Sequence, residues 1–426
     1  MSNEKNNRIS ASLRATREKR KSQVCKVFEL KVDISKCSKK TIGDLHRLFS
    51  EARWLYNFAL SQEDVFSINT TLLDKVTILN KDKAIEEREL NVIGSQIKQD
   101  VVQGIMNSIR GLSAAKKKGL KVGGLKFKSA YESVNLKQHG TTYRIKEDNK
   151  VHVQGIKADL KIRGLKQIDD EYEFANAKLV RRGNDFYLMA TCYKEKVARE
   201  KVLNNSAIGI DFGIKTDMTF SDGTKIDTKL PISKRIKKAQ KSFSRKKKSS
   251  KNRFKAKKKV QKAYDKQTNI KNEIKHKVVN CLNENFGYVA VQDENIKGWH
   301  SGLFGKQVQQ SAIGGIIADI KRMSHTHVVD RYFPSTKQCP KCKTKNKIGL
   351  DERIYHCPNC GYTKDRDIHS AGTIVGESLE TYNQITIPTE RRNFKPVEKP
   401  AAAFLSLAQN CKWVSVKQEA PCFSLE

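Results

Sequence analysis

The chain has 426 residues, 30% of them charged, and a formal net charge of +37. A charge this large costs self-repulsion unless a polyanion neutralises it, so the composition favours a nucleic-acid partner. No apolar run reaches the roughly 18 residues that span a bilayer, and the N-terminus has no apolar leader. We therefore expect a cytoplasmic protein without membrane segments, built from two to four domains.

The first half of the chain predicts a β domain interrupted by helices. Residues 1–23 are polar and basic and predict a disordered arm. Alternating apolar residues over Val24–Ile34 predict a half-buried strand, and a helical period follows within residues 36–118. Alternation then returns, with a Gly183-Asn184 turn between two runs. The simplest interpretation is one β domain over residues 24–200 with a helical insert.

A new unit opens at Ala207, where a short apolar strand runs into Asp211. A very basic segment follows at Lys234–Lys277, in which 20 of 44 residues are Lys or Arg. Such runs are more often solvated faces or disordered tails. Because this one has no Pro or Gly, we expect one or two basic helices along a phosphate backbone. The candidate nucleic-acid-binding residues are Lys237, Lys238, Lys241, Arg245, Lys246, Lys247, Lys248, Lys251 and Arg253.

Four of the ten cysteines form a C-x2-C-x14-C-x2-C array, namely Cys339, Cys342, Cys357 and Cys360. Two such pairs close a tetrahedral shell around Zn²⁺ and leave no position for water, so the expected zinc is structural. Four reduced cysteines without metal are the less favoured alternative. We interpret the neighbouring His356 as a bystander, and the scattered cysteines as core residues or incidental thiols.

Acidic residues stand at three separate places in the second half. Asp211 follows one strand, Asp293 and Glu294 follow another in "VAVQDENIKGW", and Asp365 and Asp367 precede a helix in "TKDRDIHSAG". Each place alone is commonly a turn. Brought together, three carboxylates can hold two Mg²⁺ ions roughly 4 Å apart, one activating an attacking water and one stabilising the leaving oxygen.

The motifs "GIDFGIK", "VAVQDENIKGW", "FPSTKQCPKCKTK", "CPNCGYTKDRDIHSAG" and, more weakly, "GGLKFKS" resemble TnpB, a family of transposon-encoded RNA-guided nucleases related to compact type V CRISPR effectors. The resemblance covers residues 207–376 well and residues 24–200 by layout only. It implies an α+β multidomain protein with an RNase H-like RuvC domain of α/β type that contains an inserted zinc ribbon. A β-barrel wedge domain, interrupted by a helical recognition domain, would precede it.

The implied partners are a guide RNA and target double-stranded DNA, and the implied cofactors are catalytic Mg²⁺ and structural Zn²⁺. The basic helices would then follow the guide–target heteroduplex by its backbone shape. The implied boundaries are a basic disordered arm at 1–23, the wedge domain at 24–35 and 119–200, the recognition domain at 36–118, a RuvC-like nuclease domain at 201–334 with basic helices at 234–277, the zinc ribbon at 335–363, the end of the RuvC domain at 364–380, and a C-terminal tail at 381–426.

Carried over residue by residue, the first catalytic Asp of the family falls on Asp211 and the last on Asp367. The family's usual Asn two residues later is His369 here, a departure that could alter substrate or metal–water contacts. The family's middle motif reads Glu-Asp-Leu-Asn, which would align its Glu with Gln292 and its Leu with Glu294. Gln carries no negative charge for Mg²⁺, so a literal alignment implies an inactive site.

Strand geometry offers another solution for the middle ligand. Glu294 projects from the same face as Gln292, about 6–7 Å further along, whereas Asp293 faces the opposite side. We therefore expect Asp211, Glu294 and Asp367 to be the catalytic residues and Mg²⁺ ligands. The alternative is that Glu294 only begins an exposed turn.

Our first hypothesis is an RNA-guided DNA endonuclease that hydrolyses phosphodiesters with a two-metal RuvC-type site. The alternative is a nuclease-inactive RNA-guided DNA-binding repressor of the same fold. A third and less favoured hypothesis is a basic zinc-ribbon protein that acts without a guide. The sequence leaves open the guide and its source, the flanking DNA motif, the choice between monomer and homodimer, and the function of the tail.

Overall fold

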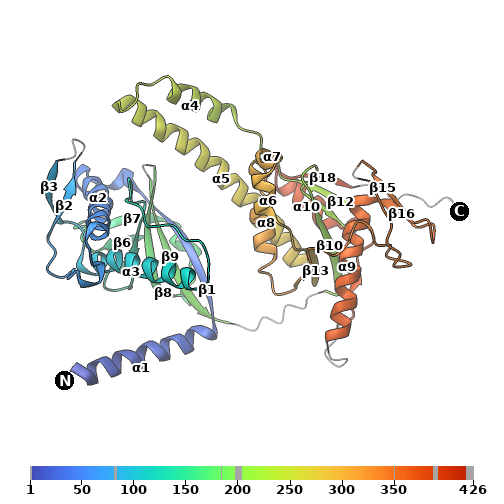
Figure 1. Ribbon diagram of the computed structural model, residues 1–426, viewed down its shortest axis with the longest axis horizontal. Coiled ribbons are helices and arrows are strands. Elements are labelled where there is room, and N and C mark those ends of the chain that lie inside the picture. The colour runs from blue at the N-terminus through green and yellow to red at the C-terminus, as the bar shows by residue number, and fades with distance from the viewer. Residues whose placement is uncertain are drawn as a thin grey trace. The chain divides into compact units, whose positions relative to one another are not determined.

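The computed structural model describes residues 2–80, 84–183, 185–196, 204–349, 351–386 and 392–418. These residues form two compact units of mixed α/β content, Met1–Ala198 and Arg199–Glu426 (Figure 1). None of the helices within the described ranges combines the length and the apolar character that crossing a bilayer requires.

The first unit is built on a seven-stranded antiparallel sheet that almost closes on itself. The hydroxyl of Tyr143, near one end of the strand order, donates a 3.0 Å hydrogen bond to the carbonyl of Ala175, in the strand next to the other end. Gly183 lies between strands Glu173–Arg182 and Asp185–Glu195 with φ at 64°, as the expected turn requires, while Asn184 lies outside the described residues. In sheet order the strands are β4 (Ser133–Leu136), β8 (Glu173–Arg182), β9 (Asp185–Glu195), β1 (Gln23–Val32), β7 (Leu160–Arg163), β6 (Lys150–Val153) and β5 (Tyr143–Lys146).

The insert between β1 and β4 contains helices α2 (Lys39–Ser61) and α3 (Ser95–Lys117). It also contains a two-stranded hairpin, β2 (Lys75–Leu79) and β3 (Ile85–Glu89), that the helical period did not predict. Glu51 of α2 is fully buried, and its carboxylate accepts hydrogen bonds from three consecutive backbone amides of residues 91–93. These bonds compensate the buried charge and fix the entry to α3.

The N-terminal segment differs from the disordered arm expected from its composition. Residues Ser2–Lys21 form helix α1, whose end is tied to β8 by ion pairs of Lys19 and Arg20 with Glu173, both at 2.9 Å. The segment has no Gly or Pro and is rich in residues that tolerate a helix, but it lacks an apolar face that would reveal one.

The second unit contains a mixed sheet with helices on both faces. The side chains of β10 alternate between the two faces of the sheet, so the core of this unit has two parts. Ile208 and Ile210 of β10 face helices α5 (Lys251–Asn285) and α8 (Ile313–Ile320), whereas Ala207 of the same strand faces helix α9 (Arg366–Ile385). In sheet order the strands are β14 (Thr326–Val329), β13 (Tyr288–Gln292), β10 (Ser206–Phe212), β11 (Met218–Phe220), β12 (Thr224–Asp227) and β18 (Ser415–Gln418), and β17 (Lys395–Pro396) also pairs with β10.

The expected C-terminal tail is largely part of this second unit. Helix α10 (Ala402–Asn410) buries Phe404 completely in the core, and β18 pairs with β12 in antiparallel register. The segment has few apolar residues, spread over one short helix and one strand, so no period was long enough to detect. Residues 387–391 and 419–426 lie outside the described residues.

Candidate functional site

Asp211 lies near the end of the central strand β10, on the face that helix α9 covers. Parallel pairing aligns Ile210 with Val291, so the next pair of positions along the two strands is Asp211 and Gln292. Asp211 follows Ala207 by four residues and therefore shares its face. The sequence thus brings the first two acidic motifs to the same edge of one sheet.

Helix α9 brings the third acidic motif to the same place. A Cβ atom on Gly209 would lie 2.0 Å from the carbonyl oxygen of Ala371, so the close packing of helix on strand requires glycine there. Asp365 caps the helix by accepting hydrogen bonds from the amides of Asp367 and Ile368, at 3.0 and 3.1 Å. Asp367 therefore stands in the first turn, where a negative charge is favourable.

The charges of Asp367 and Glu294 act on the carboxyl of Asp211. Burial is the main cause that raises the pKa of Asp211 to about 7; the charges of Asp367 and Glu294 add to the rise, and a hydrogen bond from Ser370 and the charge of Arg366 oppose it. Burial also raises the pKa of Glu294 to about 7. A group of nearby negative charges that protein cations balance only in part is stabilised when a divalent cation binds.

The three carboxylates are less compact than the cysteine cluster. Throughout the described ranges, only the four cysteines make a group of three or more Cys, His, Asp or Glu ligand atoms within 4.8 Å of one another. Oxygens bound to the same Mg²⁺ lie at most about 4.2 Å apart. The carboxylates of Asp211, Glu294 and Asp367, as they stand, therefore cannot all ligate one ion.

Gln292 is held away from this cluster by its own hydrogen bonds. It is 7% exposed, and its amide nitrogen lies within 2.7–3.1 Å of the carbonyl oxygens of Asp330, Arg331 and Phe333. Its amide oxygen accepts a 2.9 Å hydrogen bond from the hydroxyl of Ser335. Both ends of the side chain are thus occupied by backbone and hydroxyl groups.

Two serines, Ser335 and Ser370, lie between Gln292 and the acidic cluster. The hydroxyl of Ser370 lies 3.0 Å from that of Ser335 and 3.1 Å from a carboxylate oxygen of Asp211. The two hydroxyls therefore lie between the amide oxygen of Gln292 and the carboxylate of Asp211 and link the two residues through close oxygen–oxygen contacts. Sequence reasoning missed both serines. Ser370 could have been found, because it follows Asp367 by three residues and so shares its helix face.

Asp293 has different partners from its neighbour Glu294. It forms ion pairs with Lys321 and Arg331, and the hydrogen bond from Lys321 is the main cause that lowers its pKa. Lys321 and Arg331 also act on Glu294, where they lower the pKa against burial and the charge of Asp293. Asp293 serves as a structural ion-pair partner.

His369 packs against the cysteine-containing segment and not toward the acidic cluster. Its ring is fully buried and stacks on Tyr355 with centroids 3.7 Å apart and planes 9° apart. Burial lowers the pKa of His369 to about 4. This corrects the expectation that the residue alters substrate or metal–water contacts: it joins α9 to the neighbouring ribbon.

The four cysteines lie together as a tetrahedral zinc site requires. Their sulfur atoms are within 4.8 Å of one another, and the Cys339–Cys360 and Cys342–Cys357 sulfurs are each 3.5 Å apart. Four thiolates around Zn²⁺ have sulfurs about 3.8 Å apart, so this cluster could bind zinc. His356, in the strand β15 (Ile354–His356) that pairs with β16 (Thr363–Asp365), instead contacts the hydroxyl of Thr363 at 2.8 Å.

Comparisons with known proteins match both parts of this unit. A family model described as "Probable transposase" matches residues 190–300, and one described as "Cas12f1-like, TNB domain" matches residues 321–374. A Streptomyces pristinaespiralis protein named "Putative RNA-guided DNA endonuclease" is 30% identical over 184 residues, which are 41% of this chain and 46% of that protein.

These matches support a TnpB-like family for the chain.

A protein of Mycobacterium tuberculosis with the same designation is 23% identical to this TnpB-like chain over 193 residues, 41% of this chain and 42% of that protein. The chain thus spans less than half the length of the curated relatives it matches. A cryo-EM structure titled as a complex of Cas12f1, sgRNA and target DNA covers 83% of this chain and 99% of its own, with a TM-score of 0.46 and 12% identity.

The basic segment forms two helices, where one or two were expected. Helix α4 (Lys234–Ser244) and helix α5 pack against each other in a long hairpin (Figure 1). Eight of the nine candidate residues are exposed. Arg253 differs, because its guanidinium donates to the carbonyls of Phe243 and Lys246 at 3.2 and 2.9 Å and lies over the Phe243 ring. It holds the turn between the helices together.

Proposed function

We propose that the chain is an RNA-guided DNA endonuclease with a metal-dependent site formed by Asp211, Glu294 and Asp367. The observation that carries this proposal is the effect of the Asp367 and Glu294 charges on the buried carboxyl of Asp211 at one sheet edge. The TnpB-like resemblance and the names of two relatives, each called a "Putative RNA-guided DNA endonuclease", support the same reaction class.

The residues of the site have separable roles in this proposal. When bound, a pair of Mg²⁺ ions would activate a water and stabilise the leaving oxygen of the phosphodiester. Asp211, on the central strand, is suited to contact both ions, and Ser370 fixes the orientation of its carboxylate. Glu294 and Asp367 project from different elements, so each would complete a different side of the metal site.

Guide RNA and target DNA are the proposed partners. The net charge of +37 and the exposed lysines of α4 and α5 support a long contact with phosphates. We assign the second unit to an RNase H-like RuvC domain with a structural zinc ribbon. The near-closed sheet of the first unit and its insert would be the wedge and recognition domains.

Sequencing the RNA that copurifies with the chain tests the proposal, followed by cleavage of DNA matching that RNA. We expect one defined RNA species, and cleavage in Mg²⁺ that stops in EDTA. Equal cleavage in EDTA would contradict the metal-dependent site. A purified chain without RNA of defined sequence would instead favour a basic zinc-ribbon protein that acts without a guide.

A nuclease-inactive guided DNA-binding repressor is the second candidate. Gln292 favours it, because a neutral amide bound to carbonyl groups occupies the position where the family carries Glu. Tight binding of the matched DNA in Mg²⁺ without any strand cleavage would support this function and rule out the first.

A further inference from the structure

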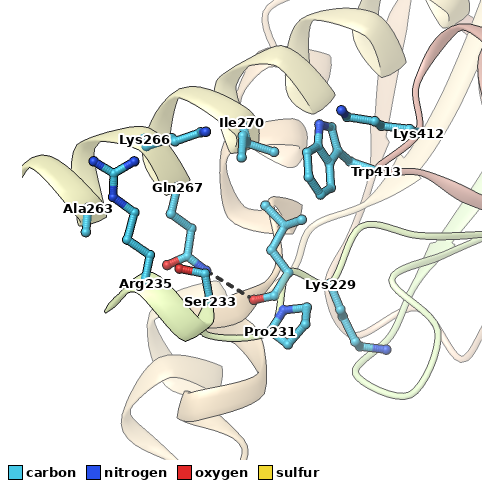
Figure 2. A pocket seen from close by; sticks show the side chains of 11 residues that line it. Lys229, Pro231, Ser233, Arg235, Ala263, Lys266, Gln267, Ile270, Lys412 and Trp413 are labelled. Atoms are coloured by element: carbon cyan, nitrogen blue, oxygen red, sulfur yellow. Dashed lines mark hydrogen bonds between the residues drawn. The ribbon is translucent and has the colours of Figure 1, made fainter. Parts of the chain in front are cut away.

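A cavity of about 480 Å³ lies in the second unit, away from the acidic cluster and the cysteine cluster (Figure 2). Its walls come from three places: the start of α4, the middle of α5, and the segment between α10 and β18. The volume is in the range of pockets that enclose small organic groups. Its lining residues are Lys229, Leu230, Pro231, Ser233, Arg235, Ala263, Lys266, Gln267, Ile270, Lys412 and Trp413.

One side of the cavity is an apolar and aromatic surface. The indole of Trp413 and the side chain of Ile270 point into the cavity (Figure 2), and Leu230 also lines it. Trp413 is only half-buried, so part of its ring is available to a ligand. The Nζ atom of Lys412 lies 4.9 Å from the centroid of the indole, which adds positive charge beside the aromatic surface.

The other side of the cavity is positively charged. Arg235 and Lys266 are exposed and lie across the cavity from Trp413 (Figure 2). Ser233 is the N-cap of α4, so the cavity also borders the positive end of a helix dipole. No Asp or Glu is among the described residues that line it. Lys229 contributes less, because it pairs with Asp227 at 2.8 Å.

We propose that this cavity binds one unpaired nucleotide of a bound nucleic-acid strand. The base would stack on Trp413, and its phosphate would lie between Arg235 and Lys266. An aromatic surface opposite cationic side chains matches the two halves of a nucleotide, and stacking tolerates any base because every base has a π-face. Bases within a duplex have both faces occupied, so the ligand is an unpaired nucleotide.

Photocrosslinking of the full chain, freed of copurified nucleic acid, tests this proposal directly. The probes are single strands of RNA containing 5-iodouridine or of DNA containing 5-iododeoxyuridine, and the crosslinked residue is identified by mass spectrometry. We expect a crosslink at Trp413. The RNA and DNA arms show which strand supplies the nucleotide. Crosslinks that map elsewhere on both probes would overturn the proposal.

Substitution supplies a second readout. Trp413→Leu should weaken binding of the crosslinking strand by roughly 5- to 100-fold, whereas Trp413→Phe should retain most of the affinity. Trp299→Leu is the matched control, because Trp299 also packs against the same core in the same unit and lies outside the cavity. Equal losses for the two leucine variants would contradict the proposal.

Neither measurement uses cleavage, so the nucleotide site and the nuclease can fail independently. A chain that crosslinks at Trp413 but cuts no DNA would keep the site and lose the proposed endonuclease. A chain that cuts matched DNA without a crosslink at Trp413 would keep the proposed endonuclease and lose the nucleotide site.

Discussion

The groups that surround Gln292 favour an amide over a carboxylate at this position. Its amide nitrogen faces three carbonyl oxygens and its amide oxygen faces the Ser335 hydroxyl. A carboxylate has no donor to offer three carbonyls, and a buried polar group without partners costs more than its bond would contribute. The residue that aligns with the family's Glu is therefore suited to its amide form here.

We predict that Gln292→Glu lowers stability and does not increase cleavage. A buried charge against three carbonyls should cost on the order of 3 kcal/mol of unfolding free energy. Thermal melting and the cleavage rate measure the two effects. A variant with a wild-type melting temperature and faster cleavage would show that position 292, and not Glu294, supplies the middle ligand.

Sequence patterns predicted which residues share a face, but not what they touch. Strand alternation separated Glu294 from Asp293; in the structure, hydrogen bonds from Lys321 and Arg331 lower the pKa of Asp293, whereas burial raises that of Glu294. The bonds that hold Gln292 come from residues 330–335, which follow another strand, and no period of the sequence relates those positions. Tertiary contacts between distant loops set this part of the site.

At the scale of elements, the placement of α9 on β10 depends on a position without a side chain. Gly209 lets the backbone of Ala371 approach the strand closely, and this approach brings Ser370 to Asp211. The Tyr355–His369 stack packs the same helix against the ribbon. Strand, helix and ribbon thus position the acidic cluster together.

Gly209→Ala should destabilise the second unit by on the order of 3 kcal/mol, because the new methyl group overlaps a backbone carbonyl. Gly372→Ala is its control, since a Cβ there meets no atom within 4 Å. Denaturant unfolding measures both. Comparable stability of the two variants would contradict the close packing of α9 on β10.

Cys339→Ser should prevent zinc binding and unfold the ribbon, because a structural metal site contributes its binding energy to folding. Metal analysis and limited proteolysis of residues 335–363 report on the two effects. Cys411→Ser is the matched control, as Cys411 is also a buried cysteine of this unit but lies outside the cluster. Full zinc content in Cys339→Ser would contradict the four-cysteine site.

The composition of the chain was a better guide to the charge of the molecule than to the structure of its two ends. The net charge predicted a nucleic-acid partner, and the basic segment forms exposed helices. Composition nevertheless suggested disorder at both termini, where α1, α10 and β18 are found. Short elements whose apolar residues are few, or whose partners are distant, leave too weak a pattern in the local sequence.

Binding of nucleic acid should weaken steeply with salt, and the basic helices should carry part of that dependence. Arg245→Gln should reduce the slope of log affinity against log salt concentration by about 1. Arg253→Gln is the contrasting variant: its guanidinium is occupied by two carbonyls, so it should lower stability and leave the slope unchanged. Equal slopes for Arg245→Gln and the wild type would argue against phosphate contact along α4 and α5.

The central claim is that Glu294 completes a metal-dependent nuclease site with Asp211 and Asp367. The most direct measurement is the cleavage rate of Glu294→Gln on guide-matched DNA in Mg²⁺, with guided DNA binding measured on the same sample. Binding should persist while cleavage falls at least about 100-fold, since one ligand charge is lost. Full cleavage by Glu294→Gln would contradict it.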